Sequence, residues 1–401
     1  METGLESQNA SVYTAPESTF PYIYVYNFNY SAKSLVSVES VICWSILATI
    51  VMVVAAFGNI IVIWIVLTNP RMRTVTNYFL LNLAIADTMI ATIDMPLMFT
   101  YIVTDNWPFG RVGCKMAKFL ANLSAVASIL SLMAVTVDRF RAIVHPLLPR
   151  LPKRVIIGSV ISIWIVAGAW TSPLFLFGGL YKFVYVDGVE RIQCHIVWPP
   201  DVLNRMNFTY TAANFVVTYC VPLAIMAVCY TIISTKLWGN GLLGENIPNR
   251  ARQITAKRKI VKMIVIVVAV FAICWLPLHS YHFLPYLNVQ SVAKVKGARH
   301  IYIALWLVAM SSSMYNPFIY CWLNDRFRYG FKRVFLCLLP IRINGYAQQH
   351  GSNVPASSNA TNTTNYMCSQ RVVNGKDHRS VSYRMPSVGI TSASDSAEDT
   401  M

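Results

Sequence analysis

Charged residues are scarce in this sequence. They make up 12% of its 401 residues, whereas 55% are hydrophobic and the mean hydropathy is +0.48. A soluble domain carries roughly 25% charged residues. Acidic residues are the scarcer sign, with 17 Asp and Glu against 33 Lys and Arg. We therefore expect an integral membrane protein without a nucleic-acid partner, in which the basic surplus reports membrane topology.

Motifs for catalysis and metal binding are also missing. The sequence has no nucleophile–base arrangement, no phosphate loop and no zinc motif. Its nine cysteines follow no CxxC or metal-ligand spacing. We therefore expect neither an enzyme nor a resident cofactor. A transporter or channel is the alternative of another class, but the sequence lacks the internal repeat that is common in transporters.

The N-terminal segment, residues 1–40, has no basic stretch followed by an apolar core. No cleavable signal peptide is expected, so the first membrane helix is expected to direct insertion. Asn9 and Asn29 stand in N-glycosylation sequons, which matter only if this segment faces the lumen.

Seven apolar stretches long enough to cross a bilayer follow the N-terminal segment. They predict an all-α membrane protein, a seven-transmembrane helix bundle over residues 41–323. The stretches lie at about 40–67, 75–103, 113–138, 154–177, 210–236, 260–285 and 299–323.

The third stretch is predicted to be the central helix of the bundle, because small residues along it allow several neighbouring helices to approach closely. The 25 residues from Cys114 to Arg139 correspond to about 37 Å of helix, so its two ends reach opposite sides of a membrane. Cys194 lies in the long loop on the side of Cys114. Both cysteines then face an oxidising compartment, which predicts a disulfide between them; two free thiols are the alternative.

Basic residues predict the orientation. The loops on the Arg139 side, with residues 324–333, carry 18 Lys and Arg, whereas the opposite loops carry 7. The positive-inside rule places the N-terminus outside the cell and the C-terminus in the cytosol.

Two further segments follow the last span. Residues 324–339 have an apolar face and basic flanks, which predicts an amphipathic helix on the inner leaflet, in contact with membrane lipids. Cys337 at its end is a candidate for palmitoylation, with a plain thiol as the alternative. Residues 340–401 are rich in Ser, Thr and Asn and are predicted to be a disordered cytoplasmic tail.

Polar residues inside the spans need a reason, because they are costly in a membrane. A carboxylate among hydroxyls and amides can hold a sodium ion; a structural hydrogen-bond network is the alternative. These residues are Asn59, Asp87, Ser128, Ser312 and Asn316.

Prolines inside the spans permit kinks. Phe271 and Trp275 lie one turn apart before Pro277, so the indole can act as a lever beside a kink or simply pack in the core. At the cytosolic ends, Asp138 can hold Arg139. Tyr230 and Tyr320 can receive this arginine when helices shift.

The ordered set of these residues resembles the rhodopsin-like G-protein-coupled receptors over about residues 45–337. The set comprises Asn59, Asp87, Cys114, DRF at 138–140, Trp164, Pro222, Trp275 with Pro277, and NPFIY at 316–320. Phe140 replaces the usual tyrosine. The resemblance assigns an activation switch to Asp138, Arg139, Tyr230, Phe271, Trp275, Pro277, Asn316, Pro317 and Tyr320.

Within this class the sequence is most similar to tachykinin receptors, particularly invertebrate ones. RMRTVTNYF at 71–79, AKRKIVKM at 256–263, FAICWLPLH at 271–279 and MYNPFIYCWLNDRFRYGFK at 314–332 carry the likeness. It implies an extracellular amidated neuropeptide as ligand, with other amidated neuropeptide families as the alternative. It also implies a heterotrimeric G protein of the Gq type acting through phospholipase C and calcium.

Further partners and ligand contacts follow from the same resemblance. Arrestin and a receptor kinase are expected at the tail. Ala121 stands where amine receptors carry an aspartate, which argues against a monoamine. The ligand-binding candidates are Asp94, Asn122, His279, His282, Tyr302 and Trp306.

Overall fold

The computed structural model describes residues 10–14, 24–28, 37–149, 151–185, 187–198, 203–238, 248–287 and 297–338. Contacts divide the chain into two units, residues 1–335 and 336–401. The first holds the helical bundle. Of the second, only the last residues of one helix are described.

Within the described ranges, six helical segments are long and apolar enough to cross a membrane. Three of them are single helices: α1 (Val38–Thr68), α4 (Gly110–Val144) and α5 (Lys153–Leu176). The span Val75–Thr104 is made of α2 (Val75–Met89), η2 (Ile90–Asp94) and α3 (Met95–Thr104), and the span Arg205–Trp238 lies within α6 (Leu203–Phe215), η4 (Val216–Cys220) and α7 (Val221–Trp238). The sixth, Ile254–Phe283, lies within α8 (Pro248–Phe283).

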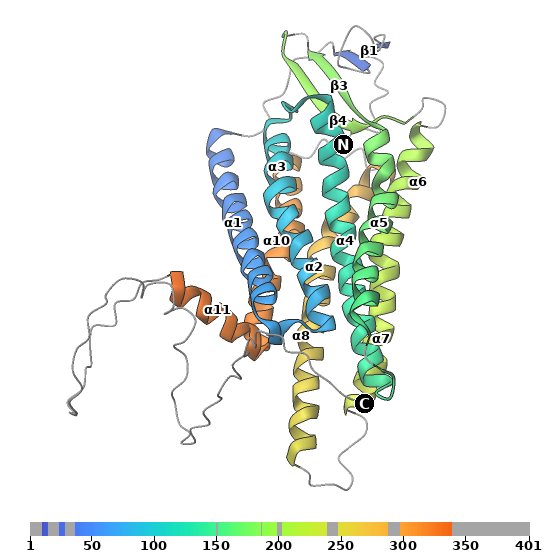
Figure 1. The fold of residues 1–401 in the computed structure, drawn as a ribbon. Coiled ribbons are helices and arrows are strands. Elements are labelled where there is room, and N and C mark those ends of the chain that lie inside the picture. The colour runs from blue at the N-terminus through green and yellow to red at the C-terminus, as the bar shows by residue number, and fades with distance from the viewer. Residues whose placement is uncertain are drawn as a thin grey trace, which may run out of the picture. The chain divides into compact units, whose positions relative to one another are not determined.

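A seventh long helix, α10 (Ala298–Leu323), completes the bundle and packs against α1 and α8 (Figure 1). Its 26 residues span about 39 Å. Polar side chains, including three consecutive serines, lower its hydropathy. Together with α10, these helices match the predicted spans to within a few residues at most ends. The short helices η1 (Pro70–Met72) and η5 (Leu284–Leu287) lie in connections.

Two of the spans contain a wide helical turn just before a proline. The segment η2 precedes Pro96, and η4 precedes Pro222. Proline has no amide hydrogen and crowds the preceding turn, so the regular hydrogen-bond ladder widens there. These turns set the direction of Asp94 and Tyr219, which lie at or within them.

The long helix α4 lies at the centre of the bundle, as the sequence predicts. It packs against α2, α5 and α7 and reaches β3 at one end. Small buried residues allow these close approaches, among them Ser124, Ala127, Ser128 and Ser131. A Cβ atom on Gly58 of α1 would lie 2.8 Å from Cγ of Pro317, so glycine permits the contact between α1 and α10.

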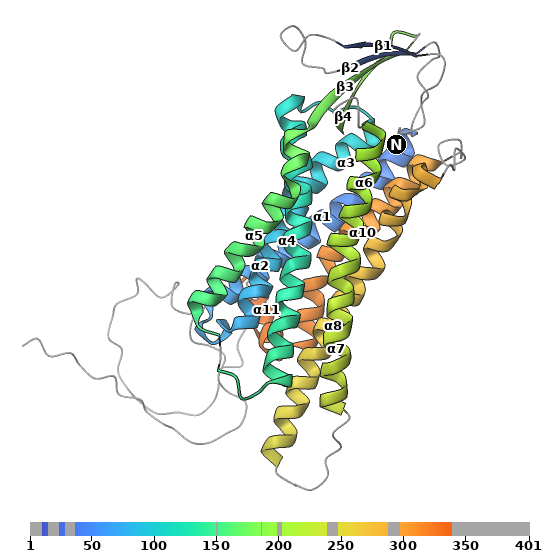
Figure 2. The same ribbon diagram turned by 90° about the vertical axis from the view of Figure 1, so that its right-hand side faces the viewer.

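A four-stranded sheet lies at the end of the bundle that carries Cys114 (Figures 1 and 2). Strands β3 (Gly178–Tyr185) and β4 (Glu190–Ile196) form an antiparallel hairpin between α5 and α6. Strand β2 (Tyr24–Phe28) pairs in parallel with β3 and antiparallel with β1 (Ala10–Thr14). The sequence analysis predicts none of these strands. We call this end of the bundle the disulfide end, and the opposite end, with Arg139, the arginine end.

The amphipathic helix predicted after the last span is present as α11 (Asp325–Leu338). Phe327 and Phe331 are buried on its apolar face, and the ring of Phe327 lies 5.6 Å from that of Tyr320. The chain therefore turns out of α10 onto an apolar surface of the bundle.

Candidate functional site

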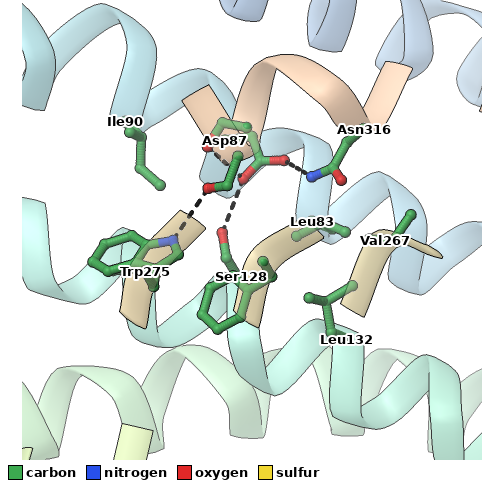
Figure 3. Close-up of a pocket in the computed structure, with 12 residues that line it drawn as sticks. Leu83, Asp87, Ile90, Ser128, Leu132, Val267, Trp275 and Asn316 are labelled. Carbon is green, nitrogen blue, oxygen red and sulfur yellow. Dashed lines mark hydrogen bonds between the residues drawn. The ribbon is translucent and has the colours of Figure 1, made fainter. Parts of the chain in front are cut away.

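The carboxylate of Asp87 is the centre of a buried network midway along the bundle (Figure 3). Asn316 donates to one oxygen at 2.7 Å, and Ser128 and Ser313 donate to the other at 3.1 and 3.2 Å. These donors come from α4 and α10, so the network joins three helices. Such bonds favour the charged carboxylate and oppose the cost of burial.

Two predicted members of this network lie beside it. Ser312 accepts a hydrogen bond from Nε1 of Trp275 at 3.1 Å instead of contacting Asp87. Asn59 donates to the backbone oxygens of Ala55 and Ser313, so it reaches Asp87 only through residue 313. Ser313, the residue that does bond Asp87, is missing from the sequence prediction because both serines are polar and one position apart.

A small cavity lies next to Asp87 and is lined by Ser128, Trp275, Ser312 and Asn316 (Figure 3). Only about 10 Å³ is available there to the centre of a water molecule, which is room for about one particle of that size. The oxygen atoms around it belong to a carboxylate, hydroxyls and an amide, and such oxygen ligands suit a hard monovalent cation. The cavity therefore fits one ion or one water and is too small for an organic ligand.

An aromatic column runs from this cavity towards the disulfide end. The ring of Phe271 lies 5.7 Å from that of Trp275, which lies 5.8 Å from that of His279. Tyr219 lies 5.1 Å from His279 and donates to the backbone oxygen of Ala272 at 2.8 Å. The predicted lever residue Trp275 is therefore in contact with a ligand candidate above it and with the cavity below it.

Five of the six candidate ligand residues lie close together near the disulfide end, and we call the region of the bundle that they border the chamber. They are Asp94, His279, His282, Tyr302 and Trp306. His282 and Tyr302 lie 6.4 Å apart, and Trp306 stacks on Phe99 at 6.2 Å. Asp94 is buried, and its Oδ1 has no hydrogen-bond partner among the described residues. Asn122 donates to the backbone oxygen of Lys118 on its own helix, and no contact with the other candidates is recorded for it.

A cation that the sequence analysis does not single out also faces this chamber. Lys118 of α4 interacts electrostatically with Asp94, His195 and His282. Burial, helped by nearby positive charge that includes Lys118, lowers the pKa of His195 well below its usual value, so this imidazole is neutral at pH 7. The chamber thus brings the carboxyl group of Asp94 and the amino group of Lys118 close together among aromatic and imidazole rings. A charged residue several positions inside the predicted span 113–138 is the signal that could have revealed Lys118.

The predicted disulfide is formed. Cys114 near the start of α4 and Cys194 in β4 are bonded, with their Cα atoms 5.6 Å apart. The bond attaches the β3–β4 hairpin to the first turns of α4.

At the arginine end, Arg139 is held as the sequence predicts. Its Nη2 lies 2.6 Å from Oδ2 of Asp138, and the same oxygen accepts a bond of 2.6 Å from Thr76 of α2. Nη2 of Arg139 also donates to the hydroxyl of Thr76. Thr76 is missing from the prediction, because no rule singles out a threonine at a helix start as the partner of a distant ion pair.

The two tyrosines of the predicted switch do not contact Arg139 in this structure. Tyr230 bonds Thr136 at 2.9 Å. The buried hydroxyl of Tyr320 has no hydrogen-bond partner among the described residues. The Tyr320 hydroxyl can therefore take a partner in a second arrangement of the helices, whereas Tyr230 would share or exchange its bond with Thr136.

Several predicted sites cannot be placed. Asn9 and Asn29 and the tail from residue 339 onward lie outside the described residues. Cys337 falls in the last turn of α11, but its side chain is also outside the described part. No group of three or more His, Cys, Asp or Glu residues that could hold a metal ion occurs in the described part of the chain.

Comparison with known proteins gives a consistent result. The chain is 39% identical over 82% of its length to the tachykinin-like peptides receptor 99D of Drosophila melanogaster, covering 62% of that protein. It is 43% identical over 76% of its length to the neuromedin-K receptor of Mus musculus, covering 65% of it. For the substance-P receptor of Meriones unguiculatus, identity is 40% over 74% of this chain and 72% of the relative.

The chain thus spans less than two thirds of the length of the first two of these relatives. The family model for the 7 transmembrane receptor (rhodopsin family) matches residues 58–320, most of the bundle from α1 to α10. This family is a receptor class, which agrees with the prediction that the protein is not an enzyme. With its seven long helices, its Asp87 network and its Asp138–Arg139 pair, the chain belongs to the rhodopsin family of seven-transmembrane receptors, a multi-pass family of the plasma membrane.

Proposed function

We propose that this chain is a receptor for an amidated, tachykinin-like neuropeptide. The observation that carries the proposal is the identity of 39 to 43% to receptors for tachykinin-like peptides and neuromedin K. The residues around the chamber support it, because their rings suit a larger, partly apolar ligand. Ala121 also stands where amine receptors carry an aspartate.

The orientation belongs to the same proposal. The disulfide end faces the cell exterior and the arginine end faces the cytosol, as the distribution of basic residues indicates. Asn9 and Asn29 are then glycosylation sites, and Cys337 is a palmitoylation site that anchors α11 among inner-leaflet lipids. The tail beyond residue 340 binds a receptor kinase and, once phosphorylated, arrestin.

Signalling follows from a two-state bundle. Peptide in the chamber contacts His279 and displaces Trp275, whose indole bonds Ser312 beside the Asp87 network. Rearrangement of this network lets α8 move outward at the arginine end. Arg139 leaves Asp138 and bonds Tyr230 or Tyr320, and the basic end of α8 lines a cleft for a G protein of the Gq type.

A sodium ion fits the same scheme. Asp87, Ser128, Ser312 and Asn316 would hold it, with the carboxylate as the charged ligand. When bound, the ion supplies positive charge that stabilises the ionised Asp87 and joins the helices in one arrangement.

The test is a calcium measurement in transfected cells. A panel of amidated neuropeptides is applied to cells that express the chain and to mock-transfected cells, with and without a Gq inhibitor. We expect a tachykinin-like peptide to release calcium only in expressing cells, and the inhibitor to abolish the response. The variant Arg139→Ala at matched surface expression should bind peptide and release little calcium. A response only to another peptide family would replace the proposed ligand, and a normal response from Arg139→Ala would contradict the assigned switch.

A further inference from the structure

Asp105 occupies an unusual backbone position at the disulfide end. It is the C-cap residue that follows α3. Its φ is 53°, the one positive φ among the described residues other than glycine. A left-handed conformation costs free energy for most L-residues, and Asp and Asn tolerate it best. The chain accepts this cost at a point where the carboxylate meets two arginines.

These arginines come from two other elements. Nη1 of Arg191 in β4 lies 2.9 Å from Oδ2 of Asp105, and Nη2 of Arg299 in α10 lies 2.6 Å from Oδ1. The three side chains are only 14 to 18% exposed. Gln193 of β4 adds a longer contact of 3.4 Å. Ion pairs with this degree of burial are screened less by salt than surface pairs are.

Backbone contacts strengthen the connection to β4. The carboxamide oxygen of Asn106 accepts from the backbone N–H of Ile192 at 2.9 Å, and the N–H of Trp107 donates to the backbone oxygen of Ile192 at 2.7 Å. Arg299 also donates to the backbone oxygen of Ile102 at 2.7 Å. The connection from α3 to α4 thus binds β4 on one side and α10 on the other.

Arg299 lies on the face of α10 that carries ligand candidates. Tyr302 is three residues further along and Trp306 seven, so all three share one face of the helix. The ion pair with Asp105 therefore constrains the height and rotation of this face. The disulfide at Cys194 attaches the β3–β4 hairpin to α4, but nothing in that bond connects it to α10.

We propose that Asp105 is a positioning residue of the ligand chamber, which ties the β3–β4 hairpin to the first turns of α10 so that the two move as one unit. Peptide retention then depends on this connection, because it holds the hairpin against the end of the helix that carries the ligand candidates Tyr302 and Trp306. The statement about peptide retention rests on the proposed function; the statement about the tie does not.

Hydrogen exchange of the purified, ligand-free receptor tests the tie directly. Asp105→Asn keeps a residue that tolerates the left-handed backbone and removes the charge. We expect amides in residues 190–196 and in residues 301–305 to exchange about tenfold faster, since hydrogen bonds between charged groups are among the stronger ones. Arg191→Gln should accelerate exchange in the first segment, and Arg299→Gln in the second.

The control is Asp187→Asn, which removes an equal charge from the turn of the same hairpin. Oδ1 of Asp187 accepts a bond of 3.3 Å from the N–H of Val189 within that turn. It should leave exchange in residues 301–305 unchanged. If Asp105→Asn also leaves that segment unchanged, Asp105 acts on the hairpin alone and the proposed tie is wrong.

A second measurement follows the peptide found in the calcium screen. Asp105→Asn should speed its dissociation about tenfold relative to Asp187→Asn, with an unchanged maximal calcium response. Faster hydrogen exchange without faster dissociation would retain the tie and reject its role in peptide retention. If no peptide of the panel activates the receptor, the proposed function fails and the exchange result still decides the tie.

Discussion

At the scale of single residues, the structure shows that Thr76 is a hydrogen-bond partner of the Asp138–Arg139 pair, which the sequence does not predict. Its hydroxyl joins both members of the Asp138–Arg139 pair. We predict that Thr76→Val raises ligand-independent inositol phosphate accumulation by about threefold to tenfold at matched surface expression, because one bond to a charged group then no longer holds Arg139. Thr68→Val is the control, since the hydroxyl of Thr68 bonds only its own helix at Trp64. Equal basal activity of the two variants would show that Thr76 does not restrain the switch.

Asp94 supports a prediction about ligand charge at the same scale. Invertebrate peptides of the resembled family commonly end in an amidated arginine, which can bind a carboxylate through two parallel hydrogen bonds. Asp94→Asn should then weaken the cognate peptide by roughly 1–3 kcal/mol and hardly affect an analogue with a neutral terminal residue. Lys118→Gln should strengthen binding of the peptide that ends in arginine, since it removes a cation that competes for Asp94. Equal losses for both peptides on Asp94→Asn would assign this carboxylate to the fold.

At the scale of elements, the disulfide makes a prediction about additivity. Cys114→Ala and Cys194→Ala each release the β3–β4 hairpin from α4. We predict that each variant abolishes high-affinity peptide binding and that the double variant is no worse, because one missing sulfur already removes the bond. Saturation binding on cells with surface expression measured in parallel checks this. Clearly additive losses would mean that the two thiols act separately.

An ion pair also joins α8 to the first residue of α11. Lys259 lies 2.9 Å from Asp325, whose pKa is lowered chiefly by this hydrogen bond. A lowered pKa means that the pair stabilises this arrangement at every pH above the usual range for Asp and weakens only as pH falls through the lowered value. At cytosolic pH the pair is therefore formed. Because both side chains are exposed, its contribution is small.

We predict that Asp325→Lys raises basal signalling by about twofold and that the added change Lys259→Asp restores it, since the pair restrains the outward movement of α8. Inositol phosphate accumulation without peptide measures both. Failure of the double variant to restore the basal level would indicate that the two charges act on the G protein independently.

The elements also show which features of the structure can be predicted from the sequence. Hydropathy and intramembrane prolines predict the spans and the kinks, because the bilayer imposes one long apolar helix per crossing. The Cys114–Cys194 bond and the Asp138–Arg139 pair follow from spacing along single helices and from sidedness. Contacts between distant elements do not: Thr76 with Arg139, Ser313 in place of Ser312 at Asp87, and Asp105 with Arg299 depend on helix rotations that no local pattern encodes. The pairing of β2 with β3 joins segments far apart in the sequence, which no local pattern predicts. The β3–β4 hairpin has a local signal, the Asp187–Gly188 turn, which the prediction leaves unused.

At the scale of the whole molecule, the two ends are connected through the Asp87 cavity. The aromatic column reaches the cavity from the chamber, and Asn316 and Pro317 of α10 connect it to Tyr320 at the arginine end. Coupling through such a route is an equilibrium property: any ion that binds one arrangement more tightly lowers the affinity of a ligand that needs the other. The cavity has room for about one small particle beside a carboxylate, so sodium is the ion whose effect should report this coupling.

We predict that sodium lowers agonist peptide affinity several-fold in membranes that contain the receptor, because an ion held by Asp87, Ser128, Ser312 and Asn316 stabilises the arrangement in which Trp275 bonds Ser312. Binding is measured in sodium chloride and in choline chloride at equal ionic strength, so that general screening is the same in both. Asp87→Asn removes the charged ligand and should abolish the difference between the two salts. Ser131→Ala is the matched control, because Ser131 lies one turn further along α4 and bonds Asn82 and Ala127 instead of the cavity; the sodium effect should persist there. An equal sodium effect in the original receptor and in Asp87→Asn would place the ion elsewhere and leave the Asp87 network a purely structural connection between the three helices.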